Sequence, residues 1–194
     1  MECAGFARSF SGIGLMLSLS VLGCHENNFD GPFTMYTSIA SSDLNGDGCP
    51  DLAVANYGSP DGSIKGSASI LLQDPANPGK FFLTTDYVTG SRSTSIAIGD
   101  LNSDGKPDLA VANSKSLSPG PTGNISLLFQ DPGNPGSFLP AVRLPGISQP
   151  VSVAIGDLNG DGDADIVVAD DGAVVYYQDP FRHGIFSGPV RIRP

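Results

Sequence analysis

The sequence contains no tryptophan, only two histidines and three cysteines, and ten basic residues that form no run. Phosphate contacts need clustered Lys and Arg, so a formal net charge of −10 without a basic patch excludes a nucleic-acid binder. Charged residues make up 15% of the chain, below the usual ~25%, whereas Gly and Pro are abundant. This composition predicts many turns and argues against an all-α bundle. The 194 residues suffice for one domain with a short appendage.

Near the N-terminus, the apolar run at residues 13–22 is too short to span a bilayer, which needs ~20 residues, and fits a signal-peptide core. It is followed by Gly23 and Cys24, and the resulting Val-Leu-Gly-Cys resembles a bacterial lipobox, in which the cysteine becomes the lipidated first residue. Two features depart from that pattern, since the only basic residue before the run is Arg8 and Leu22 is bulky for its position.

This N-terminal pattern predicts an exported protein. We expect a cell-surface or outer-membrane lipoprotein, or otherwise a secreted protein, that meets a membrane only through a lipid anchor on Cys24. We assign residues 1–23 to the signal peptide and residues 24–32 to a linker. Because Cys3 would leave with the signal and Cys24 would be acylated, Cys49 has no partner and no intrachain disulfide is expected.

The acidity is concentrated in three nine-residue segments, 43–51, 100–108 and 157–165, which we call the first, second and third acidic loops. Positions 1, 5 and 9 of these loops hold nine of the twenty acidic residues, so the rest of the chain is nearly neutral. Three divalent cations would balance most of the excess. The charge distribution therefore indicates metal binding before any motif is considered.

The acidic loops belong to an internal repeat of 57 residues, the spacing between Asp43, Asp100 and Asp157. A Ser-Ile-Ala or Ser-Val-Ala sequence precedes each loop, an apolar run such as Leu-Ala-Val-Ala-Asn follows it, and Gln-Asp-Pro comes later in each unit. Short Val-, Ile- and Leu-rich pieces bounded by turn residues predict strands. Four antiparallel strands per repeat describe a β-propeller blade, so the fold class is all-β. In the second unit the expected strands are 81–89, 94–99, 109–113 and 124–130.

Three loops predict about three blades within residues 33–194, an open or partial propeller. The tail 184–194 repeats the first strand of the earlier units, so we assign it to the start of a fourth blade. Residues 33–37 leave too little chain for that strand in the first unit. Either the sequence is part of a longer propeller, or strand exchange between copies completes the blade in an oligomer.

Each acidic loop reads Asp-x-Asn-x-Asp-Gly-x-x-Asp and begins like an EF-hand loop. However, position 12 holds Val54, Val111 or Val168 in place of the bidentate Glu, and strands flank the loop. Calcium prefers six to eight hard oxygen ligands, which positions 1, 3, 5 and 9 would supply from side chains and position 7 from a main-chain carbonyl. The alternative is a set of polar hairpin turns, but three complete copies favour about three Ca²⁺ ions. The predicted ligands are Asp43, Asn45, Asp47, Cys49 and Asp51; Asp100, Asn102, Asp104, Lys106 and Asp108; and Asp157, Asn159, Asp161, Asp163 and Asp165.

The repeat Ser-Ile-Ala-Ile-Gly-Asp-Leu-Asn-Ser-Asp-Gly-Lys-Pro-Asp-Leu-Ala-Val-Ala and its two copies resemble the FG-GAP or VCBS repeats of bacterial surface proteins and of the integrin α-subunit propeller. The similarity covers about residues 33–194. It implies a β-propeller with a calcium ion in the hairpin loop of each blade, where the ion stiffens the blade and ligands bind elsewhere. Integrin-like propellers have seven blades, whereas this chain has three motifs.

The sequence predicts a non-catalytic module for protein interaction or adhesion. Catalysis needs a nucleophile with a base or paired carboxylates in a cleft. His25 lies beside the predicted anchor, His183 lies in a turn, and the paired carboxylates are metal ligands, so we expect no catalytic residue. The alternatives are a glycan-binding propeller, with Tyr57 as the one aromatic in a candidate binding loop, or an accessory segment of a larger secreted enzyme.

Strand parity predicts which face binds the partner. In an antiparallel meander the acidic loops share one end of the blades with the turns that follow Gln-Asp-Pro. The loops at 56–67, 113–123 and 170–172, which vary in length, share the other end. Because loop variation on one face of a repeat scaffold is typical of a binding surface, we expect the protein or glycan ligand opposite the acidic loops.

Overall fold

The computed structural model describes residues 35–59, 63–114 and 123–192. The chain divides into two units between Gly31 and Pro32, and all the described residues belong to the second. The predicted signal peptide, the linker and parts of the loops at 56–67 and 113–123 therefore lie outside the description. In the described segments every regular element is a strand, and a search of them for a membrane-crossing helix finds none.

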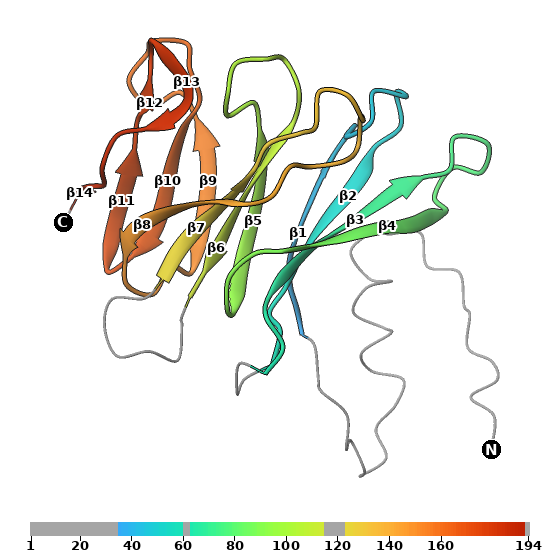
Figure 1. Ribbon diagram of the computed structural model, residues 1–194, viewed down its shortest axis with the longest axis horizontal. Coiled ribbons are helices and arrows are strands. Elements are labelled where there is room, and N and C mark those ends of the chain that lie inside the picture. Colours follow the sequence, from blue (N-terminus) through green and yellow to red (C-terminus); the bar gives the residue numbers. More distant parts are fainter. Residues whose placement is uncertain (1–34, 60–62, 115–122, 193–194) are drawn as a thin grey trace. The chain divides into compact units, whose positions relative to one another are not determined.

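Twelve of the strands form three four-stranded antiparallel sheets (Figure 1). The first sheet has the order β1-β2-β3-β4, the second β5-β6-β7-β8 and the third β9-β10-β11-β14, while β12 and β13 pair as a separate ribbon. The strands are β1 Tyr36–Ser42, β2 Asp51–Asn56, β3 Ser67–Gln73, β4 Phe81–Val88, β5 Ser93–Gly99, β6 Asp108–Asn113, β7 Gly123–Leu128, β8 Val142–Ile147, β9 Ser152–Gly156, β10 Asp165–Asp170, β11 Gly172–Tyr176, β12 Gln178–Asp179, β13 Arg182–Phe186 and β14 Val190–Ile192.

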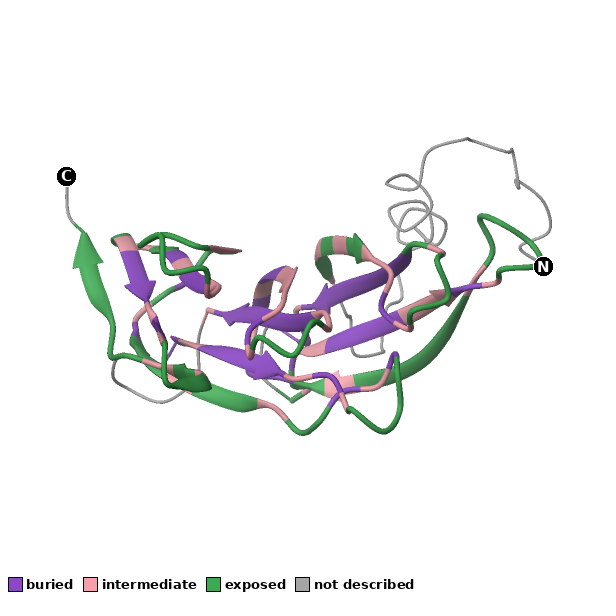
Figure 2. Ribbon diagram, turned by 90° about the horizontal axis from the view of Figure 1, so that it is seen from above, coloured by how far each residue is buried: buried purple, intermediate pink, exposed green. Residues whose placement is uncertain are grey.

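The sheets are arranged as the blades of a propeller that is not closed. Strand β1 contacts β5, and β5 contacts β9, so the first strands of successive sheets are neighbours. The outermost strands, β4, β8 and β14, are mostly exposed, whereas β2 and β6 are buried along their length (Figure 2). The all-β, four-stranded blade predicted from the repeat is confirmed.

The assignment of strands to blades corrects one expectation. The strand predicted to open each unit is the last strand of the preceding sheet: β4 pairs with β3, and β8 pairs with β7. In the same way Val190–Ile192 pairs with β11 and completes the third sheet, so the tail does not begin a fourth blade. The first sheet has four strands of its own, β1 to β4, so it lacks none. A missing strand therefore gives no reason for strand exchange.

Alternation along the central strands explains how the sheets pack. In β6, Leu109 and Val111 face the first sheet, whereas Ala110 and Ala112 face the third. In each interface the central strand of one sheet therefore places large aliphatic side chains toward a preceding sheet whose own central strand contributes alanines. One core joins the first and second sheets and a second core joins the second and third.

Hydrogen bonds between connections confirm the predicted parity. At one end, the main-chain nitrogen of Gly66, before β3, donates to the carbonyl of Gly90, after β4, over 2.7 Å. At the other end lie the acidic loops and the turns that follow Gln-Asp-Pro, joined by the contacts described below. The acidic loops and the connections of variable length therefore lie at opposite ends of the blades.

Candidate metal-binding loops

The first aspartate of each acidic loop closes the loop on itself. In the first loop the two carboxylate oxygens of Asp43 accept from the main-chain nitrogens of Gly46 (2.7 Å) and Gly48 (2.9 Å). Asp157 makes the equivalent bonds to Gly160 (2.6 Å) and Gly162 (3.0 Å). These main-chain donors hold the pKa of Asp157 below its usual value. The Asp157 carboxylate therefore stays ionised at neutral pH.

Positions 3 and 5 form a second pair in every loop. The amide oxygen of Asn45 accepts from the nitrogen of Asp47 (2.9 Å), and its amide nitrogen donates to that carboxylate (2.9 Å). Asp47 in turn accepts from the nitrogen of Cys49 (2.8 Å), which lowers its pKa. The glycine at position 6 has a positive φ, +85° at Gly48, which a side chain would disfavour. Position 5 therefore orients the peptide of position 7, the predicted carbonyl ligand.

Position 9 plays a structural role that the sequence analysis missed. Both oxygens of the buried Asp51 accept main-chain hydrogen bonds, one from Leu44 at the start of the loop (2.9 Å) and one from Gln73 at the end of β3 (2.8 Å). The same pair of bonds recurs at Asp108 and Asp165, at distances of 2.8 to 3.0 Å. Each of these carboxylates thus ties an acidic loop to the main chain at, or two residues beyond, the end of the third strand of its blade.

A buried glutamine extends this tie to the turn at the same end. The side-chain nitrogen of Gln73 donates to the carbonyl of Pro50 (2.7 Å), and its oxygen accepts from the nitrogen of Gly79 (2.7 Å). Gln178 likewise contacts the carbonyl of Ala164 (3.2 Å) and the nitrogen of Gly184 (2.8 Å). The threefold Gln-Asp-Pro repeat was the signal that could have revealed this role.

The donor chemistry of each loop fits calcium. Three carboxylates, one amide oxygen and one carbonyl are all hard oxygens, the ligands that Ca²⁺ prefers. Within residues 35–59, 63–114 and 123–192, however, no three His, Cys, Asp or Glu side chains gather in one cluster. The carboxylates instead accept amide hydrogen bonds, and each oxygen has a second lone pair for a metal. The same five positions of each loop would hold the ion.

The position-9 carboxylate of the second loop, Asp108, has a raised pKa. Burial raises the pKa of Asp108 to about 6, against the opposing effect of its two main-chain donors, and the nearby Asp104 and Asp100 raise it further. A cation beside these three carboxylates would favour the ionised form. Without a cation, ionising Asp108 therefore costs more free energy than ionising an exposed aspartate.

The remaining candidate residues have structural partners. The Arg92 guanidinium lies over the ring of Tyr57, 5.9 Å from the centroid, so one face of this candidate sugar platform is covered. His183 lies 3.5 Å from Asp163 through its Nδ1 and a carboxylate oxygen. His25 and Cys24 lie outside the described residues, and the predicted face opposite the acidic loops is described only in part.

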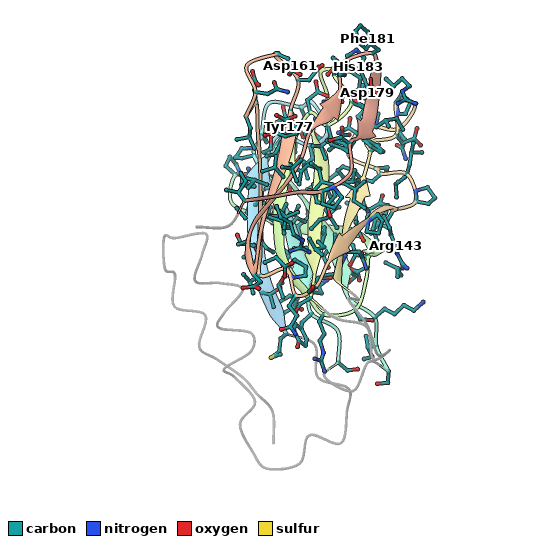
Figure 3. The ribbon with its side chains drawn as sticks, turned by 90° about the vertical axis from the view of Figure 1, so that its left-hand side faces the viewer. Arg143, Asp161, Tyr177, Asp179, Phe181 and His183 are labelled. Atoms are coloured by element: carbon teal, nitrogen blue, oxygen red, sulfur yellow. The ribbon has the colours of Figure 1, made fainter. Side chains whose placement is uncertain are left out.

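The turn that joins β12 and β13 carries a feature that sequence reasoning passed over. Phe181 is 91% exposed, and Asp179, Phe181 and His183 lie at the same end of the third blade as Asp161 of the third acidic loop (Figure 3). The corresponding turns contain Ala76 and Gly133 at that position. The scaffold is the same, because Asp179 accepts from the nitrogen of Phe181 (3.0 Å) as Asp74 does from Ala76 (2.9 Å). A large apolar side chain thus projects from an otherwise repeated turn.

Comparison with known families identifies the repeat. The FG-GAP-like repeat matches residues 43–111 and 116–168, which is more than half of the chain. A search of curated proteins finds no match. The matched segments contain all three acidic loops and most of the strands of the three sheets, and the first match begins at Asp43, directly after β1. The chain therefore belongs to the FG-GAP-like repeat family, and its blades are FG-GAP repeats.

Proposed function

We propose that this protein is a non-catalytic, calcium-stabilised β-propeller module for protein interaction or adhesion, exported and exposed at the cell surface or secreted. The observation that carries the proposal is the threefold recurrence of one oxygen-rich loop on the same end of three successive blades. FG-GAP repeats are β-propeller-like interaction modules, and the geometry of the loops supports a stabilising role for the ion.

In this proposal about three Ca²⁺ ions occupy the three acidic loops. Positions 1, 3, 5 and 9 would bind through side chains and position 7 through its carbonyl, as set out for the sequence. When bound, the ion supplies positive charge that offsets repulsion among three carboxylates. The protein's own contribution is to hold position 9 at the start of a strand and to hold position 7 through position 5.

Calcium titration by calorimetry tests this part of the proposal. We expect about three ions per chain for protein first stripped with a chelator. Asp104→Ala should remove one ion, because it takes a carboxylate from the second loop and frees the peptide of Lys106. Lys106→Ala is the matched control, since only the carbonyl of Lys106 is a proposed ligand. A chain that binds no calcium would overturn the proposal.

The partner is proposed to be a protein that meets the face opposite the acidic loops, where connections of unequal length gather. The β10–β11 connection is a tight turn in which Asp170 pairs with Gly172, whereas the corresponding loops at 57–66 and 114–122 are longer. A glycan is the alternative ligand, and an accessory role within a larger secreted enzyme is the third possibility. A glycan array separates the first two, and a hydrolase panel tests the last.

Export and anchoring follow from the N-terminal pattern. The proposal is cleavage before Cys24 and lipidation of that cysteine. Labelling cells with a clickable fatty acid should mark the wild-type protein and not Cys24→Ser. Label that persists on the variant, or wild-type protein without label, would rule out this anchor and leave simple secretion.

A further inference from the structure

Position 4 distinguishes the second acidic loop from the other two. Gly46 and Gly160 occupy this position in the first and third loops, with φ values of +79° and +81°. The second loop has Ser103 there, with a φ of +58°. A residue with a side chain is disfavoured in this left-handed conformation. A serine held at a glycine position is therefore expected to make a contact that compensates.

Ser103 contacts the third acidic loop. Its hydroxyl donates to a carboxylate oxygen of Asp163, at position 7 of that loop, over 2.7 Å. His183, from the turn between β12 and β13, approaches the same oxygen from Nδ1 at 3.5 Å. The Asp163 side chain is only 14% exposed. Three segments far apart in sequence thus meet at one carboxylate between the second and third blades.

The equivalent positions between the first and second loops are not joined in this way. Gly46 has no side chain to donate, and the ammonium of Lys106 instead contacts the carbonyl of Pro132 at 3.3 Å. Among the described residues, the Ser103 hydroxyl thus has no counterpart between the first pair of loops. The first loop meets the second blade through a different contact, in which the side-chain nitrogen of Gln130 donates to the carbonyl of Leu44 over 2.8 Å.

The bridge acts on a group next to a proposed ligand. The main-chain carbonyl of Asp163 is the proposed position-7 ligand of the third loop. The main-chain nitrogen of Asp163 donates to the carboxylate of Asp161 over 2.9 Å. Fixing the Asp163 side chain restricts the peptide that carries this carbonyl. Ser103 itself lies between Asn102 and Asp104, two proposed ligands of the second loop. An ion that orders the second loop would thereby order part of the third, so its entropic cost would be shared.

We propose that Ser103, Asp163 and His183 form an inter-loop bridge that couples the second and third calcium sites, so that these two sites bind Ca²⁺ with positive cooperativity. The inference rests on the proposed calcium binding. Ser103 and His183 act here as positioning residues, because neither supplies a proposed ligand atom.

Calcium titration with the first site disabled by Asp47→Ala tests the coupling. In this background we expect two ions with a Hill coefficient above one, and coupling in the range typical of linked sites, at least ~5-fold. Ser103→Ala, which keeps the strained backbone and removes the hydroxyl, should reduce the Hill coefficient to one. Asp163→Ala should do the same although it keeps the carbonyl ligand. Adding Ser103→Ala to Asp163→Ala should have no further effect, since both remove one contact.

A matched control and a calcium-free measurement separate the bridge from calcium binding itself. Gly160→Ser places the same residue at position 4 of the third loop, where an added Cβ meets no atom within 4 Å. The φ of +81° disfavours the new side chain there as it does at Ser103, so this variant adds the strain without the bridge and should leave the cooperativity unchanged. In EDTA, hydrogen exchange within residues 157–165 should be faster in Ser103→Ala than in the parent, with exchange within residues 43–51 unaltered.

Each result decides a different claim. Two independent sites in the parent, or cooperativity that survives Ser103→Ala, would overturn the coupling. If Ser103→Ala and the parent showed the same exchange within residues 157–165 in EDTA, the claim that the bridge orders the third loop would be wrong. A chain that binds no calcium would overturn the proposed function and the coupling together, and the exchange measurement alone would then decide whether the bridge orders the third loop.

Discussion

The first two blades and the third blade carry the same leucine at position 2 of the acidic loop, with opposite surroundings. Leu44 is 1% exposed and Leu101 is 0% exposed, because each packs into the core formed with the next sheet. Leu158 is 49% exposed, since no further sheet follows the third among the described residues. The repeat therefore specifies an interface side chain in every blade, and the neighbouring blade decides whether it is buried.

The first blade shows the complementary difference at the end of its second strand. The side-chain oxygen of Asn113 accepts from the nitrogen of Gly90 (3.1 Å), in the connection that precedes its blade, and from the hydroxyl of Ser93 (2.9 Å), the first residue of β5. Asp170 likewise accepts from Ser148 (3.1 Å). In the part of the chain that the structure describes, the equivalent oxygen of Asn56 is buried without a hydrogen-bond partner. The first blade thus has a buried oxygen without a hydrogen-bond partner among the described residues, and the third blade has an exposed leucine where the other two blades have a buried one.

The largest expected effect separates Leu101 from Leu158. Leu101→Ala should lower the free energy of unfolding by about 2 to 5 kcal/mol, because it removes buried methyl groups and leaves a cavity between blades. Leu158→Ala should cost less than about 1 kcal/mol, since water already reaches this side chain. Urea denaturation of both variants measures the difference. Equal losses would show that the third blade is covered in solution.

The second comparison is between a residue proposed to bind calcium through its side chain, Asp104, and one proposed to bind only through its main-chain carbonyl, Lys106. Asp104→Ala should abolish the stabilisation that one bound ion provides, about 2.7 kcal/mol at a hundredfold excess of calcium over its Kd. Lys106→Ala should change the stability far less, because its exposed ammonium makes one long contact, to Pro132. Unfolding in saturating calcium measures both. If the lysine variant lost as much as the aspartate variant, position 7 would act through its side chain.

The smallest expected effect concerns association through the exposed face of the third blade. Exposed apolar blade faces and sheet edges favour self-association. Leu158→Lys should reduce the mass-average size of the calcium-loaded protein in light scattering, with Leu101 left intact to preserve the fold. A wild-type protein that stays monomeric at all concentrations would contradict the prediction that the protein associates through this face.

Strand positions were predictable because apolar runs and turn residues alternate along the chain. The expected strand 94–99 is found at Ser93–Gly99, and 109–113 at Asp108–Asn113. The partner of the strand Phe81–Val88 was not predictable, because an amphipathic strand carries no mark of which neighbour it pairs with. The tail was misassigned for the same reason.

The acidic loops were recognisable from spacing, whereas the orientation of position 9 was not. An aspartate at the start of a strand reads the same whether its oxygens face a cation or two buried amides, as those of Asp51 do. The contact of Ser103 with Asp163 joins residues 60 apart and depends on how two blades meet. Such contacts become visible only when the packing between repeats is known.

Thermal unfolding with and without a chelator tests the central claim most directly. Each acidic loop carries three carboxylates, at positions 1, 5 and 9, and an ion that bound only the folded state would relieve their repulsion and stabilise the fold. We predict that the melting temperature rises markedly with calcium and falls in EDTA, and that Asp47→Ala, Asp104→Ala and Asp161→Ala together abolish the difference. A melting temperature that is the same in calcium and in EDTA would contradict the account.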